Sequence, residues 1–135
     1  MIYTTYMSNI KNIPSNAIKI LITRWKPRKS DFIKKENILW RPNLGPTELT
    51  LARFKDGSIN WQEFRKIFLD ESFDNKMFLE GMEEITAYAK NNDVFLICYE
   101  KEDIFCHRSI LREILNFNDY ECIEYRKVNE NINGE

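Results

Sequence analysis

The sequence has little of several residue types, and each shortage excludes a class of protein. It contains three cysteines among 135 residues, and an odd number of thiols does not fit the disulfide framework of a small secreted domain. No apolar run reaches the roughly 20 residues that a membrane-spanning helix needs. The first residues also lack the basic region and cleavage site of a signal peptide. We therefore expect a cytoplasmic protein with no membrane partner.

The chain also lacks an excess of charge of one sign and a glycine-rich phosphate loop. Its formal net charge is −1, so there is no general basic surface for nucleic acid, which is a possible partner but not the favoured one. The four glycines form no dinucleotide fingerprint. A site for a small anionic ligand must therefore be a local patch. The length suits a single domain over 1–135, and the abundance of Ile, Asn and Lys is typical of bacterial or phage proteins from AT-rich genomes.

Four segments have the composition of β-strands. β-Branched and aromatic residues fill 1–7, apolar residues fill 17–25 and 94–99, and 121–128 is expected to form a last strand at an edge. The run 94–99 has no polar alternation, which predicts burial on both faces, as in a parallel sheet. Residues 129–135 are expected to form a frayed tail.

Three stretches have the periodicity of helices. Asn60 followed by Glu63 is typical of a capping box and predicts a helix that ends near Ser72. We expect Asp74 to cap the next helix. An apolar stripe predicts a third helix over 106–117. Strands that alternate with helices predict the α/β class, as a single small layered domain whose largely parallel sheet is flanked by helices.

Residues 26–58 are the hardest part of the chain to assign. Prolines and glycines exclude a long helix through most of it, and 38–45 has room for a short strand. Loops of this length are often functional. At its start, Arg24 ends a buried strand, and Trp25 offers a face for stacking beside a group of cations.

The stretch 94–115 passes from an apolar run through a charged loop into a helix, and it places a thiol, an imidazole and a guanidinium side by side. Ligands of open α/β sheets lie beyond the carboxyl ends of the strands, where the first turn of a helix presents unpaired N–H groups. That environment lowers the pKa of a thiol or binds phosphate and carboxylate. We therefore predict two overlapping sets of site residues. The candidate catalytic set is Cys98, Glu100, Cys106 and His107, and the anion-binding set is Arg24, Trp25, Cys106 and Arg108.

For each of these residues a structural role is the competing interpretation. Two more specific motifs, a phosphatase loop and a zinc site, are not favoured by the sequence. Cys106 and Arg112 have the Cys-x5-Arg spacing of a phosphatase loop, but the residues between them have the pattern of a helix. Cys98, Cys106 and His107 lack the paired spacing of a zinc site and would need a fourth ligand from elsewhere. We therefore predict no metal and no cofactor, and we interpret Cys122 as structural.

The same stretch resembles the C-terminal signature of the domain-of-unknown-function family numbered 488, in which a strand ends in a Cys-x-Glu-like segment and Cys-His-Arg opens a helix. The corresponding residues here are Cys98, Glu100, Cys106, His107 and Arg108. The strand-end Arg24 and the central Leu44-Gly45 pair are also similar. Many members carry an aspartate where this chain has Ile22, and its absence favours binding over catalysis if that aspartate takes part in chemistry. The resemblance implies a small single α/β domain and supplies no established reaction.

These observations predict an intracellular protein that binds a phosphorylated or nucleotide-like small molecule, with a thiol and an imidazole as its catalytic groups if it is an enzyme. The alternative is a non-enzymatic module that sequesters a small molecule or recognises nucleic acid, and binding to nucleic acid would weaken steeply with salt. A third interpretation is an interaction protein whose segment 26–58 docks a partner. The sequence leaves the reaction and the oligomeric state open.

Overall fold

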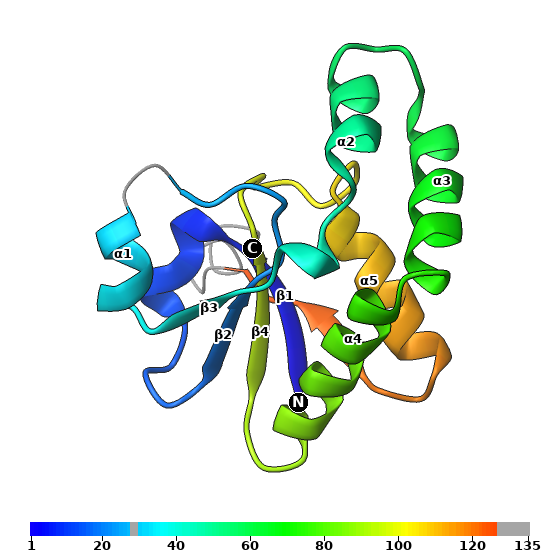
Figure 1. Cartoon of the computed structure of the whole chain (residues 1–135). Helices are drawn as coiled ribbons and strands as arrows, with labels where there is room; N and C mark the ends of the chain where they lie inside the picture. Colours follow the sequence, from blue (N-terminus) through cyan, green and yellow to red (C-terminus); the bar gives the residue numbers. More distant parts are fainter. Residues whose placement is uncertain (28–29, 127–135) are drawn as a thin grey trace, which may run out of the picture.

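A sheet of five parallel strands forms the centre of the computed structural model, which describes residues 1–27 and 30–126 (Figure 1). The strands are β1 (Ile2–Tyr6), β2 (Ile18–Leu21), β3 (Ile38–Trp40), β4 (Val94–Cys98) and β5 (Cys122–Glu124). Their spatial order is β3-β2-β4-β1-β5, and each neighbouring pair is parallel. The predicted α/β domain with a largely parallel sheet is thus confirmed. The tail expected at 129–135 lies outside the described residues.

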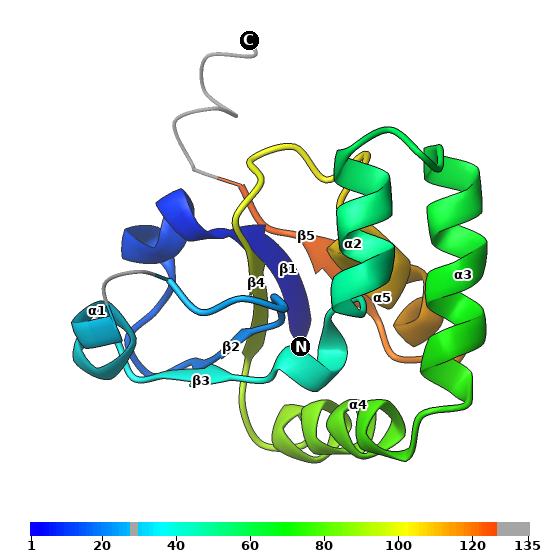
Figure 2. The ribbon, with the colours of Figure 1, turned by 45° about the horizontal axis from the view of Figure 1, so that its top comes forward.

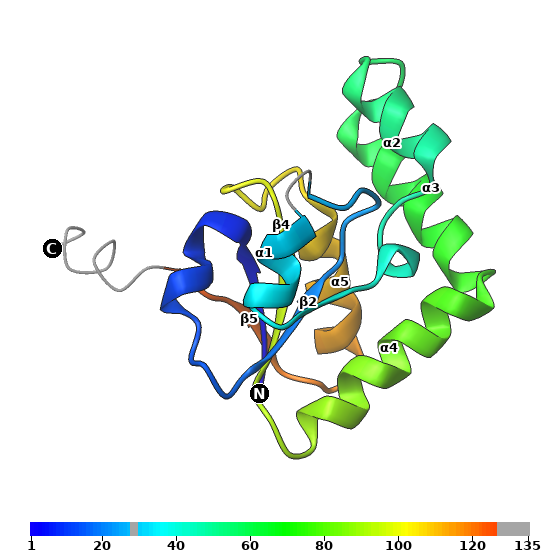
Figure 3. The same cartoon turned by 60° about the vertical axis from the view of Figure 1, so that its left-hand side comes forward.

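Helices cover both faces of this sheet. The α-helices are α1 (Ser30–Lys35), α2 (Glu48–Lys55), α3 (Trp61–Phe73), α4 (Lys76–Ala89) and α5 (His107–Phe117), and the 3-10 helices are η1 (Met7–Asn12) and η2 (Pro42–Leu44). Residues of η1 and α1 belong to the core on one face, and residues of α3, α4 and α5 belong to the core on the other (Figures 2 and 3). In the described part of the chain, no helix has both the length and the apolar character needed to cross a bilayer.

Strand β4 is buried on both faces, as its uninterrupted apolar run predicts. Val94, Leu96 and Cys98 join the core formed with α3, α4 and α5, whereas Phe95 and Ile97 join the core formed with η1 and α1. Because side chains alternate along a strand, this register places the Cys98 thiol on the side of the sheet where α5 begins.

The helix boundaries follow local hydrogen bonding. The predicted capping box of α3 is confirmed, since the Glu63 N–H donates to the Asn60 side chain over 2.8 Å and the Asn60 N–H donates back to the Glu63 carboxylate over 3.0 Å. The prediction that Asp74 caps α4 was wrong. Asn75 is the cap, because its Oδ1 accepts from the N–H groups of Met77 and Phe78, while the backbone of Asp74 still ends α3.

Segment 26–58 contains more regular structure than its prolines and glycines indicate. The short strand expected within 38–45 is β3, but α1, η2 and α2 were not predicted. These helices have only six, three and eight residues, too few turns to produce a readable apolar period. The chain between β1 and β2, where no helix was predicted, likewise contains η1.

Two glycines allow this segment to approach its neighbours closely. A Cβ atom on Gly45 would lie 2.8 Å from the backbone nitrogen of Arg24, and backbone atoms have little freedom to move away. A Cβ atom on Gly81 of α4 would instead meet side-chain atoms of Asn43 and Leu44, also at 2.8 Å. The absence of a side chain at Gly45 therefore allows the chain just after β2 to lie against the chain just before α2, directly beside the predicted site.

We predict that Gly45→Ala lowers the free energy of unfolding by more than about 2 kcal/mol, since the added methyl group overpacks against main-chain atoms. Gly81→Ala is the matched control, because its contacts are with side chains that can shift and alanine is the better helix former by about 1 kcal/mol. Urea denaturation of both variants checks the difference. Equal losses from the two substitutions would contradict the close approach at Gly45.

Candidate functional site

The carboxyl ends of β2 and β4 lie side by side, and the residues that follow them carry most of the predicted site. Leu21 pairs with Ile97, and the Ile22 N–H donates to the Ile97 carbonyl over 3.0 Å, so that Ile22 lies level with Cys98. The chain after β2 leads to α1 on one face, whereas the chain after β4 leads to α5 on the other (Figures 1 and 2). Open α/β sheets bind their ligands where two neighbouring strands diverge in this way.

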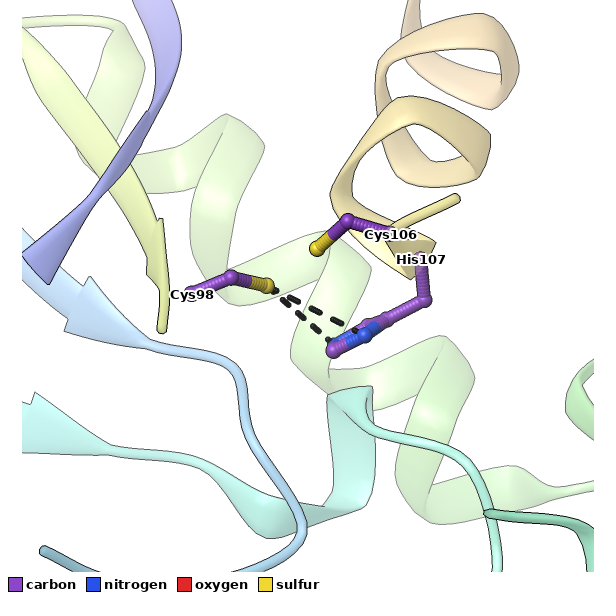
Figure 4. Close-up of side chains that lie close together, drawn as sticks. All are labelled: Cys98, Cys106 and His107. Atoms are coloured by element: carbon purple, nitrogen blue, oxygen red, sulfur yellow. Dashed lines mark hydrogen bonds between the residues drawn. The ribbon is translucent and has the colours of Figure 1, made fainter. Parts of the chain in front are cut away.

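Three side chains of the predicted catalytic set meet at this edge (Figure 4). Cys98 ends β4, Cys106 is the N-cap residue of α5 and His107 is its first residue. The Cys98 sulfur lies 3.8 Å from Nδ1 and 3.7 Å from Nε2 of His107. The ligand atoms of the three residues all lie within 4.8 Å of one another, and all three are buried. The folded chain thus assembles a group of potential metal ligands that the sequence spacing did not indicate.

A backbone carbonyl orients the imidazole of His107. Nε2 lies 2.6 Å from the carbonyl oxygen of Ile22. A carbonyl oxygen only accepts, so Nε2 carries the hydrogen in this bond. Glu100, the fourth residue of the predicted catalytic set, lies with its Oε2 atom 3.6 Å from the Cys106 sulfur. The lone-pair position of a neutral His107 is therefore Nδ1.

The two thiols at this site have opposite tendencies to ionise. A hydrogen bond from Cys98 is the largest influence on Cys106 and lowers its pKa, whereas burial raises this pKa. A hydrogen bond with His107 and the positive charges of His107 and Arg108 lower the pKa of Cys106 further. Burial, followed by the neighbouring Cys106, raises the pKa of Cys98 well above its usual range. Burial lowers the pKa of His107, but its hydrogen bond and attraction to Cys106 outweigh burial and raise it. The arrangement favours a Cys106 thiolate beside a protonated imidazole.

The predicted role of Arg108 as a ligand for an external anion needs correction, because its guanidinium is fully buried and already bonded within the protein. Nε and Nη2 donate to the carboxylate of Glu124 over 3.1 and 2.9 Å. Nη1 donates to the Glu100 carbonyl over 2.6 Å and to the Cys106 sulfur over 3.4 Å, and Nη2 also donates to the Lys101 carbonyl over 2.9 Å. Arg108 therefore joins β5, the loop after β4 and the thiol.

The amide of Cys106, which was also predicted to bind the anion, is likewise engaged within the protein. Its N–H donates to the carbonyl of Asp103 over 3.1 Å. The sulfur of Cys106 remains close to two other groups of the site, the carboxylate of Glu100 and the guanidinium of Arg108. Cys106 contributes to the site through its side chain rather than its backbone.

Arg24 and Trp25 reach the same edge as His107. Together with Glu100 they line a small cleft of about 50 Å³ in front of the imidazole. The Arg24 Nε donates to the carbonyl of Pro46 over 2.7 Å, which holds the guanidinium against the cleft wall. Arg24 and His107 therefore share one cleft, although they lie far apart in the sequence.

Several contributors to this site were missed in the sequence. Lys55 and Tyr99 also line the cleft, and the Tyr99 hydroxyl donates to the Trp25 carbonyl over 2.7 Å. Lys55 carried no signal, because only the tertiary structure brings α2 back to the sheet edge. The Ile22 carbonyl carried none either, since every residue has this group. Glu124 did carry a signal, because an acidic residue within a predicted strand indicates a buried cation as its partner.

Replacing Arg108 by methionine is predicted to cost about 3–5 kcal/mol of unfolding free energy, because the substitution breaks a buried ion pair. Glu124→Gln should cause a similar loss, since it removes the negative charge that balances the fully buried guanidinium of Arg108. Guanidinium denaturation measures both losses.

The matched control is Arg65→Ala, which breaks the ion pair with Glu113 on the surface between α3 and α5. Exposed pairs of this kind contribute less than about 1 kcal/mol. If the loss from Arg108→Met were no larger than the loss from Arg65→Ala, the buried pair would not be what holds this edge together.

Comparison with known proteins gives one match. The family model described as Domain of unknown function DUF488 matches residues 8–115, which include β2, β3, β4 and the residues that line the cleft. No curated protein matches the chain, and no solved structure does. The match covers well over half of the chain, so the predicted family is confirmed, and the chain belongs to the DUF488 family of domains of unknown function.

Proposed function

We propose that the protein binds a small phosphorylated or nucleotide-like molecule in the cleft between the ends of β2 and β4. The observation that carries this proposal is the convergence of Arg24, Lys55 and His107, from three distant segments, on one cleft. Two cations and an imidazole supply the hydrogen-bond donors and positive charge that a phosphate group requires. The position is also the one at which open parallel sheets bind ligands.

The dimensions of the cleft suit the anionic end of such a ligand. A volume of about 50 Å³ accommodates a few water molecules at about 10–15 Å³ each, which is comparable with one phosphate group. The remainder of the ligand would lie outside the cleft, where Trp25 and Tyr99 are 54% and 40% exposed. Their rings offer the stacking surface that a nucleobase uses.

Charge at the cleft favours a small anion over a nucleic acid. Glu100 also lines the cleft, and its carboxylate would repel the anionic group of a ligand from that side of the cleft. We therefore expect the anionic group to lie toward Arg24 and Lys55. A long polyanion would need a wider basic surface than this chain, with its net charge of −1, provides.

The proposal includes a candidate catalytic set behind the cleft. A Cys106 thiolate would be the nucleophile, and His107 beside it would donate a proton to a leaving group. Cys98 would stabilise the thiolate through its hydrogen bond. Glu100, whose Oε2 lies 3.6 Å from the Cys106 sulfur, would accept a hydrogen bond from the protonated thiol, and the proton of the thiol would pass to His107 when the thiolate forms.

A non-enzymatic binding module is the second candidate, and the burial of Cys106 favours it. This side chain is 3% exposed, and it does not belong to the lining of the cleft. A nucleophile must approach the reacting atom to about 3–3.5 Å. Catalysis would therefore need a movement of Glu100 or of the loop before α5, whereas binding would not.

A cytoplasmic location is part of the proposal. Cys98, Cys106 and Cys122 are free and buried. Free thiols persist in a reducing compartment, where disulfide formation is suppressed.

Calorimetric titration with inorganic phosphate, pyrophosphate and AMP tests the binding site. We expect Lys55→Ala to weaken binding of pyrophosphate roughly tenfold, which corresponds to one charge-assisted contact. Arg53→Ala is the matched control, because Arg53 is an exposed cation on the same helix and does not line the cleft. Equal affinities for the two variants, or no binding of any probe by the wild type, would refute the anion site.

Alkylation of the native, chelator-treated protein by iodoacetamide separates the two candidate functions. If Cys106 is reachable and acts beside the anion, pyrophosphate at ten times its dissociation constant should slow its modification about tenfold. Mass spectrometry of the Cys106 peptide measures the rate. A Cys106 that reacts only after unfolding would instead support the binding module.

A further inference from the structure

We propose that Cys98, Cys106 and His107 bind a zinc ion, the two cysteines through Sγ and the histidine through Nδ1. The three side chains converge from the end of β4 and the start of α5 (Figure 4). Their ligand atoms all lie within 4.8 Å of one another. Two thiolates and an imidazole form a donor set that favours zinc over harder cations such as magnesium or calcium.

The distances suit a tetrahedral ion. Bonds of about 2.3 Å to sulfur and about 2.0 Å to nitrogen place the ligand atoms of a tetrahedral zinc site about 3.5–3.8 Å apart. The Cys98 sulfur is already 3.8 Å from Nδ1 of His107. Because no separation within the group exceeds 4.8 Å, the remaining ones need to shorten by at most about 1.3 Å to reach the zinc geometry, a change that rotation of the cysteine side chains can supply.

The groups around the ligands are those that a metal site needs. The Nε2–H group of His107 donates to the Ile22 carbonyl over 2.6 Å, which leaves Nδ1 as the metal-binding atom. Metal-bound histidines characteristically donate their other N–H group to a carbonyl or carboxylate. Nη1 of Arg108 donates to the Cys106 sulfur over 3.4 Å. Two of the three ligands are therefore already oriented by hydrogen bonds from outside the site.

Charge and burial support the same conclusion. Two thiolates balance the charge of a divalent ion, so the loaded site would add no net charge to the buried edge of the sheet. Glu100 offers a further donor, since its Oε2 atom lies 3.6 Å from the Cys106 sulfur and the residue lines the cleft. Its carboxylate, or a water molecule in its place, would complete the tetrahedron. Three protein ligands and an exchangeable fourth are the pattern of catalytic zinc sites.

This inference goes beyond the proposed function and does not depend on it. Zinc would hold Cys106 as a ligand, so a nucleophilic Cys106 would belong to the metal-free protein only. In the zinc-bound protein, an anion in the cleft would approach the fourth coordination position of the zinc ion rather than the sulfur of Cys106. The zinc test below uses no anion, and the pyrophosphate titration uses no metal, so the two proposals can fail separately.

Cobalt substitution of the full chain tests the site directly. We expect Co²⁺ added to reduced, chelator-treated protein to give thiolate-to-metal charge-transfer absorption and the ligand-field bands of a tetrahedral ion. Zinc should displace the cobalt with one-to-one stoichiometry. X-ray absorption at the zinc edge of the wild-type protein should show two sulfur ligands, a measurement that does not depend on the folding of any variant.

Variants identify the ligands. Cys98→Ser and Cys106→Ser should each lower zinc affinity by more than about 100-fold, beyond the loss that outer-shell substitutions cause. Cys122→Ala is the matched control, because this third buried cysteine lies outside the ligand group, and it should keep the wild-type affinity. Circular dichroism establishes that each variant is folded. Absence of a thiolate band in the wild type, or equal zinc affinity in wild type, Cys98→Ser and Cys106→Ser, would overturn the proposal.

Discussion

The carboxyl edge of the sheet depends on the buried guanidinium of Arg108. Its hydrogen bonds reach the edge strand β5 through Glu124, the loop after β4 through the carbonyls of Glu100 and Lys101, and the sulfur of Cys106. A fully buried cation is tolerated only when its donors are satisfied, so these groups constrain one another. The residue that we predicted to bind an external anion thus positions the groups that surround the site.

The site has two layers that meet at His107. The imidazole lines the cleft together with Arg24 and Lys55, and it also contacts the sulfur atom of Cys98 behind it. Its orientation comes from Ile22, which lies beside Cys98 because β2 and β4 pair in parallel. A change in that register would separate the acceptor from the imidazole. The same pairing creates the crevice, since the chain leaves the two strands toward opposite faces of the sheet.

Features that depend on neighbouring residues could be predicted from the sequence. The capping box between Asn60 and Glu63 is formed by residues three apart, and the burial of β4 on both faces follows from a run without polar alternation. The failures were also local in origin. Asp74 and Asn75 are both good caps, and only the backbone path decides which side chain can reach the free N–H groups. The short helices α1 and α2 contain too few turns to show a period.

The sequence by itself determined the α/β class, the strand–helix junction and the residue types that meet there, because these follow from periodicity, capping and composition over short distances. Only the tertiary structure decided which of these residues share a site. It turned Arg108 inward to Glu124, brought Lys55 to the cleft, and placed the Cys98 sulfur against His107. These outcomes depend on strand order and register, which set the spacing of segments far apart in the chain and which local patterns do not encode.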